Sequence, residues 1–118
     1  MSARTTTRTA LPLSEATFFI LLSLAAGPHH GYAILKEVGS LSDGRVALST
    51  GTLYGAIKRL LTDRWIQPCG GGSGEGGPGR PRKAYQLTHA GRQILKAESA
   101  RLQSLVHLAR TRAVLEGP

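Results

Sequence analysis

Apolar residues near the middle of the chain recur at the spacing of a two-faced helix. They follow an i, i+4, i+7, i+8 pattern, which places them on one side of a helix: Leu53, Ile57, Leu60 and Leu61. The opposite side carries hydroxyls, cations and glycine, with Tyr54 on its flank and no carboxylate before Asp63. Ser49 or Thr50 can cap the start of this helix. The pattern predicts a helix over residues 49–63 whose outer face either binds a polyanion or simply faces solvent.

Two further helices are expected before it. Residues 13–26 are apolar around most of a helix and begin with Ser14 as a cap, which predicts burial on most sides, partly against a second subunit. A turn at His29-His30-Gly31 leads into a short helix over residues 31–38, and residues 39–47 are expected to form a loop. A short helix, a turn and an amphipathic helix in this order are typical of a helix-turn-helix.

Two short strands and a long helix are expected after it. Residues 65–69 form a strand that Pro68 confines to a sheet edge, and residues 83–87 alternate along a second strand. Together they predict a β-hairpin around the glycine-rich residues 70–79. A helix over residues 88–115 follows, about 40 Å long, with an interrupted apolar seam. Because so small a domain cannot cover a helix of this length, the seam predicts pairing with a second copy of the chain.

The charge balance points to an anionic partner. The chain has 118 residues, enough for one domain, with 15 Lys and Arg against 7 Asp and Glu and a formal net charge of +8. That excess favours nucleic acid or an anionic membrane surface. Cys69 is the single cysteine, which excludes an internal disulfide and a cysteine-based zinc cluster. Residues 1–10 lack the apolar core of a secretory signal and residues 18–26 are too few to span a bilayer, so we expect a cytoplasmic protein.

The residue patterns of catalysis and metal binding are missing from the sequence. We find no paired carboxylates, no nucleophile elbow and no metal-ligand spacing, which argues against an enzyme. His29 and His30 are adjacent, so they do not share a helix face, and no third ligand lies near them in the sequence. We therefore expect no metal, no cofactor and no catalytic residue. A pH-sensitive or phosphate-facing imidazole is the alternative use of these histidines.

A second basic segment lies at the far side of the expected hairpin. In Gly79-Arg80-Pro81-Arg82-Lys83 the proline disfavours helix at the residue before it, so the arginines are extended. An extended arginine can follow a phosphate backbone or enter a narrow minor groove. The alternative is a solvated loop tip.

Four motifs carry a resemblance to a known family. They are Gly27-Pro28-x-His30-Gly31-Tyr32, Leu48-Ser49-x-Gly51-Thr52-Leu53-Tyr54, Lys58-Arg59-Leu60, and Gly79-Arg80-Pro81-Arg82-Lys83-x-Tyr85-x-Leu87-Thr88-x-x-Gly91. With them, residues 13–95 resemble the PadR family of bacterial transcriptional regulators, in its small subgroup with one C-terminal helix. Thr50 and Gly55 stand where the family commonly has proline. Arg64 stands where the family usually has glycine, in a left-handed turn that arginine disfavours.

The resemblance implies a mainly α fold with a small β-hairpin, in which a winged helix-turn-helix is followed by a C-terminal dimerisation helix. We expect a flexible basic arm over residues 1–12, a DNA-binding domain over 13–87 with its wing at about 65–87, and a dimerisation helix over 88–118. The implied function is that of a homodimeric, ligand-responsive repressor that binds a pseudo-palindromic operator. The alternative is a protein that binds nucleic acid or an anionic surface without sequence preference.

These roles can be assigned to residues. The expected contacts to double-stranded DNA are Tyr32, Lys36, Ser49, Thr50, Thr52, Tyr54, Lys58, Arg59, Arg80, Arg82 and Lys83. The expected homodimer interface consists of Phe18, Phe19, Leu22, Leu95, Leu102, Leu105, Val106 and Ala109. Trp65 is a candidate wall of a pocket for a small apolar or aromatic effector, and core packing at the helix-to-wing junction is its alternative role.

Overall fold

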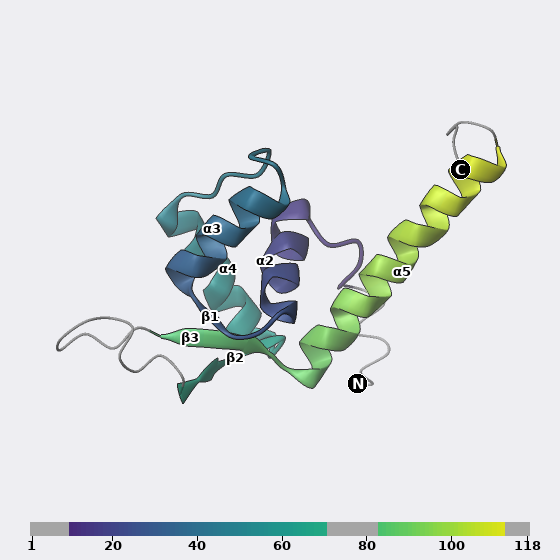
Figure 1. The fold of residues 1–118 in the computed structure, drawn as a ribbon. Helices are drawn as coiled ribbons and strands as arrows, with labels where there is room; N and C mark the ends of the chain where they lie inside the picture. The colour runs from purple at the N-terminus through teal and green to yellow at the C-terminus, as the bar shows by residue number, and fades with distance from the viewer. Residues whose placement is uncertain (1–9, 71–82, 113–118) are drawn as a thin grey trace.

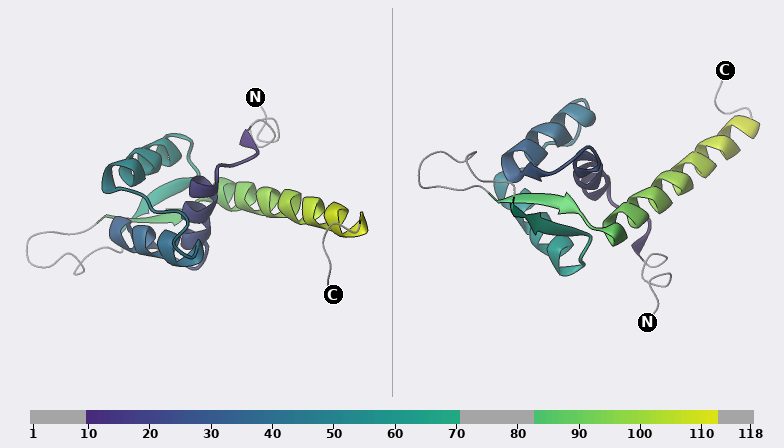
Figure 2. Two further views of the ribbon diagram at one scale, coloured as in Figure 1. Left: turned by 90° about the horizontal axis from the view of Figure 1, so that it is seen from above. Right: turned by 60° about the horizontal axis from the view of Figure 1, so that its bottom comes forward.

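The computed structural model describes residues 10–70 and 83–112 (Figure 1). Its elements are α2 (Glu15–Ala25), β1 (His29–His30), α3 (Gly31–Leu41), α4 (Thr50–Thr62), β2 (Ile66–Cys69), β3 (Ala84–Leu87) and α5 (His89–Thr111). Helices α2, α3 and α4 gather around the small sheet, and α5 extends away from them as a long rod (Figure 2). The expected mainly helical architecture, a winged helix-turn-helix with a long C-terminal helix, is confirmed.

The core forms where the helices turn their apolar faces toward one another. Ser14 caps α2 by accepting a hydrogen bond from the Thr17 N–H at 3.1 Å, as the sequence predicted. The helical core residues are Ile20, Leu21, Leu24, Ile34, Val38, Leu53, Ala56, Ile57, Leu60, Ile94 and Leu95. Helix α2 contacts α3, β3 and α5, which explains why its sequence is apolar around most of its circumference.

Helix α4 has the two faces that its sequence predicted. Ser49 is its N-cap and accepts a hydrogen bond from the Thr52 N–H at 3.1 Å. Leu53, Ile57 and Leu60 are buried in the core. The residues on the opposite face are exposed: Thr50, Gly51, Thr52, Tyr54, Gly55, Lys58 and Arg59. The hydrophobic contact of one face therefore determines which side chains the other face presents.

The sheet differs from the expected two-stranded hairpin because it has a third strand. The order of its strands is β1-β3-β2, and both pairs are antiparallel. His29 pairs with Tyr85 and His30 with Ala84, so the expected turn at the histidines is instead a two-residue strand. A strand this short shows no alternation that a sequence pattern could reveal. Pro68 lies on the edge strand β2, as predicted.

Helix α3 is also longer than expected. It continues through Gly39 and ends at Leu41, whereas the sequence pattern predicts an end at residue 38. The chain then reverses through Asp43 and Gly44, whose φ angles are 58° and 80°. The left-handed backbone of these two residues ends the helix. Gly39 is tolerated inside the helix at a cost of about 1 kcal/mol relative to alanine.

The turn from α4 into the wing has the left-handed backbone that glycine usually provides. Arg64 has a φ of 63°. Its carbonyl accepts a hydrogen bond from the Thr88 hydroxyl at 2.6 Å, and the Thr88 N–H donates to the Trp65 carbonyl at 3.0 Å. A Cβ at Gly91 would overlap that Trp65 carbonyl, so glycine is required there. These contacts join the end of α4, the wing and the start of α5.

A buried carboxylate attaches α5 to the segment before α2. Glu98 is only 2% exposed and accepts a hydrogen bond from the Leu13 N–H at 3.0 Å. Arg101 binds it through two nitrogens, Nε to Oε1 at 2.6 Å and Nη2 to Oε2 at 3.0 Å. The hydrogen bond from Arg101 lowers the pKa of Glu98, burial opposes that shift, and the Leu13 N–H and the Arg101 charge add to it. The residue that interrupts the apolar seam of α5 is therefore part of the core.

Replacing Arg64 tests the left-handed turn. Arg64→Gly should raise the free energy of unfolding by about 1 kcal/mol, because glycine adopts this backbone without the steric cost of a Cβ. Arg64→Ala is the matched control, since it removes the same side chain and keeps the Cβ. Urea unfolding measures both variants, and equal stabilities for the two would contradict the explanation.

Acid should release the bond between Glu98 and Arg101. Because the folded pKa of Glu98 lies below its ordinary value, the stabilisation is present above about pH 4.5 and is lost as pH falls through the folded pKa. We expect the wild type to be more stable than Glu98→Gln at neutral pH and the difference to shrink as the pH falls below about 4.5. Urea unfolding along a pH series measures this, and a difference that does not change with pH would exclude the carboxylate as its origin.

Candidate nucleic-acid interface

The exposed face of α4 presents hydrogen-bond donors and cations without a carboxylate. The Ser49 hydroxyl donates to Thr52 Oγ1 at 2.9 Å, in addition to capping the helix. Since Thr52 Oγ1 accepts that bond, its own proton remains to be donated outward. Lys58 and Arg59 follow further along the helix and are both exposed. This face can bind a surface that carries acceptor groups and negative charge.

The start of α3 lies beside this face. His30 caps α3, and its Nδ1 accepts a hydrogen bond from the Ala33 N–H at 3.4 Å. Tyr32 is exposed in the first turn, and the Lys36 ammonium lies 5.7 Å from the centroid of its ring. Two of the predicted contacts from α3 therefore share one exposed side of the helix.

A pocket joins α3, α4 and β3. Its volume is about 270 Å³, and its walls are formed by His30, Gly31, Tyr32, Tyr54, Lys83 and Tyr85. The Tyr54 hydroxyl contacts Gly31 so closely that a Cβ at this glycine would overlap it. Tyr54 thus leans from α4 across the beginning of α3, although 47% of the residue is exposed. Gly31 makes this position of the tyrosine possible.

Tyr85 is a residue of this surface that sequence reasoning did not include. It is 5% exposed and comes from β3, the central strand. Burial raises the pKa of its phenol, and the neighbouring Tyr54 raises it further, so the hydroxyl stays protonated and can donate. The sequence placed Tyr85 in an alternating strand and in a family motif, but only the fold shows that it lies beside Tyr54.

The structure places most of the predicted DNA contacts on one continuous set of elements. Six come from α4 and the residue that caps it: Ser49, Thr50, Thr52, Tyr54, Lys58 and Arg59. Tyr32 and Lys36 come from α3, and Lys83 lies directly before β3. Arg80 and Arg82 lie outside the described residues.

The residues predicted for a dimer interface differ in their exposure. Leu95 is buried in the core of its own subunit, so its expected place on a free surface is wrong. Leu102, Leu105 and Val106 are exposed on α5, and Ala109 is partly buried. Phe18, Phe19 and Leu22 are partly buried on α2, where they pack against the core.

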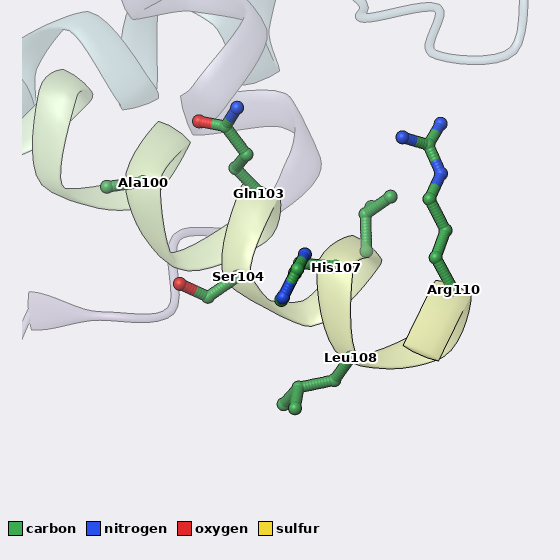
Figure 3. A pocket seen from close by; sticks show the side chains of 7 residues that line it. Ala100, Gln103, Ser104, His107, Leu108 and Arg110 are labelled. Atoms are coloured by element: carbon green, nitrogen blue, oxygen red, sulfur yellow. The ribbon is translucent and has the colours of Figure 1, made fainter. Parts of the chain in front are cut away.

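The outer half of α5 has a further exposed residue, Leu108, which is 56% exposed and was not predicted. It lines a shallow surface pocket whose residues all come from this helix: Ala100, Gln103, Ser104, Val106, His107, Leu108 and Arg110. Figure 3 shows their side chains pointing outward from the helix in different directions. This pocket is thus the exposed surface of one helix and not an enclosed cavity.

Trp65 is partly buried and packs against the core at the junction of α4 and the wing. No helix in residues 10–70 and 83–112 combines the length and the apolar character that crossing a membrane requires.

This architecture defines a winged helix-turn-helix protein. Residues 20–97 match the family model described as the Transcriptional regulator PadR-like family, and the chain belongs to that family. Its class is therefore that of DNA-binding transcription regulators and not of enzymes.

Known proteins share parts of the sequence and the fold. Over 86 residues, 73% of the chain, it is 38% identical to an uncharacterized 37.1 kDa protein in transposon TN4556 of Streptomyces fradiae, and the match spans 22% of that protein's length. A PadR family transcription regulator from Clostridium difficile has a similar fold, with a TM-score of 0.68, 24% identity, and 85% of this chain and 99% of that chain covered. Bacillus subtilis PadR, in complex with operator DNA, has a TM-score of 0.59 and 23% identity over 69% of this chain and 44% of that chain. At these identities the two structures show the shared fold alone.

Proposed function

We propose that this protein is a homodimeric repressor that binds a pseudo-palindromic operator with sequence preference. The exposed face of α4 is the observation that carries the proposal, because it combines hydroxyls and cations on a helix whose other face is buried. A helix can enter the major groove, where each base pair has its own pattern of donors and acceptors. The fold shared with a PadR that was crystallised with operator DNA supports this use of α4.

We further propose which residues contact bases and which contact phosphates. Thr52 would contact base edges through its outward hydroxyl proton. Lys36, Lys58, Arg59 and Lys83 would supply affinity for phosphates, together with Arg80 and Arg82 from the wing. Residues 13–87 would act as the DNA-binding domain and residues 88–118 as the dimerisation segment, with residues 1–12 as a basic arm.

The exposed residues of α5 support the homodimer. Leu102, Leu105 and Val106 are spaced by three and four positions, so they lie on one side of the helix. Their side chains are exposed, and an exposed apolar row of this kind is typical of an interface. A twofold axis beside α5 would present two α4 helices to successive major grooves, about 34 Å apart.

The role as a repressor and the response to a small apolar or aromatic effector rest on the family resemblance. Trp65 is the proposed wall of the effector site, although its packing against the core also explains its position. Its fluorescence during titration with planar aromatic compounds reports on that role, and an unchanged signal at saturation would remove Trp65 from the site.

Two substitutions on α4 test the DNA assignment on duplexes enriched from a random library. Lys58→Met should weaken binding to every duplex and reduce the slope of log K against log salt by about 1, because it removes one phosphate contact. Thr52→Val should instead change the order of preference among duplexes. Lys96→Met, on the exposed side of α5, is the charge-matched control.

The same experiment distinguishes the alternative function. If no duplex is enriched, or if heparin and random DNA compete as well as the enriched duplex, the protein binds anions without sequence preference.

A charge on α5 tests the dimer. Leu105→Glu should shift the protein from dimer to monomer in sedimentation equilibrium, since it places a carboxylate in the apolar row. Gln93→Glu adds the same charge at an exposed position near the start of α5 and should remain a dimer. A monomeric wild type, or a Leu105→Glu variant that stays dimeric, would exclude this interface.

A further inference from the structure

The pocket between α3, α4 and β3 contains more hydrogen-bond donors than packing requires. It is lined by all 3 tyrosines of the chain, Tyr32, Tyr54 and Tyr85, and by Lys83. None of its lining residues is acidic. Such a set of hydroxyls with an ammonium is suited to a ligand that offers several acceptor oxygens and a negative charge.

Tyr85 points most clearly to a ligand. This residue is only 5% exposed, and no described residue forms a hydrogen bond with its hydroxyl. Among the described residues, every side-chain oxygen that is closed off from solvent has a hydrogen-bond partner. Because the Tyr85 hydroxyl has no partner, it is open to the pocket that Tyr85 lines. A phenol that is buried except for an unpartnered hydroxyl is a donor that a ligand can satisfy.

Tyr54 supplies a second donor to the same pocket. Its hydroxyl contacts Gly31, the first residue of α3, and therefore lies beside the start of that helix. Backbone N–H groups of a first helical turn and the helix dipole favour an anion at this place.

We propose that this pocket binds one phosphodiester of the DNA backbone in each half-site, with the hydroxyls of Tyr54 and Tyr85 and the ammonium of Lys83 as donors. The inference rests on the proposed function and makes it more specific. Tyr54 becomes a contact to the backbone, whereas base discrimination is left to residues such as Thr52. The donors come from α4, from β3 and from the residue before β3, so one bound phosphate would contact the recognition helix and the wing together.

Tyr85→Phe is the most direct test, because it keeps the buried ring and removes only the donor. Its affinity for an enriched duplex and for a scrambled duplex should fall by the same factor, about tenfold, as expected for one hydrogen bond to a charged group. Tyr54→Phe, at an exposed position, should act alike and serves as the second variant if Tyr85→Phe does not fold. Lys83→Met should weaken binding, and Lys96→Met should not.

Single methylphosphonate substitutions in the enriched duplex locate the phosphate. Neutralising one phosphate per half-site should weaken wild-type binding, and the same substitution should cost Tyr85→Phe much less, because its donor is already missing. A Tyr85→Phe variant that binds as tightly as the wild type overturns the inference. So does a loss confined to one base sequence, or a methylphosphonate series in which no position depends on Tyr85.

Two further outcomes are distinguishable. If the wild type binds no duplex, the proposed function itself fails. If inorganic phosphate raises the unfolding midpoint of the wild type but not of Tyr85→Phe, while DNA binding does not depend on Tyr85, the pocket takes free phosphate and the assignment to the DNA backbone is wrong.

Discussion

The burial of one face of α4 is the contact on which the rest of the interface depends. Leu53, Ile57 and Leu60 are buried in the core, and each contributes about 1.5–3 kcal/mol through the removal of apolar surface from water. With these residues buried, the rotation of the helix about its axis is determined. Thr52, Lys58 and the other polar residues must then face outward together, and no separate interaction is needed to align them.

Two sets of local contacts connect α4 to the wing, to α5 and to the segment before α2. The left-handed Arg64 turn, held by Thr88, joins the end of α4 to the wing and to the start of α5. Glu98 connects α5 to the segment before α2 through Leu13 and Arg101. The candidate DNA-binding elements and the exposed row on α5 are thus parts of one packed unit. In the proposed dimer, this packing would set the distance between the two recognition helices.

Periodicity predicted α4, and residue type predicted its cap and the edge position of Pro68, because these features depend on neighbours in the sequence. It could not predict β1, whose two histidines become a strand only by pairing with Tyr85 and Ala84. Glu98 looked like an interruption of an apolar seam because its partner Leu13 lies 85 residues away. Tyr85 was missed for the same reason: its neighbours Tyr54 and Gly31 come from other elements, and no spacing in the sequence brings them together. The sequence also predicted Leu95 at the dimer interface, whereas it is buried in the core of its own subunit. The spacing of apolar residues on a helix is the same whether they face the core or a partner.

Hydroxyl-radical footprinting of the protein on its enriched duplex tests the central claim most directly, namely that two copies of α4 read one operator. We expect two protected segments on the same side of the duplex, about one helical turn apart, with matching protection within each half-site. A single protected segment, or even protection along the whole duplex, would contradict it.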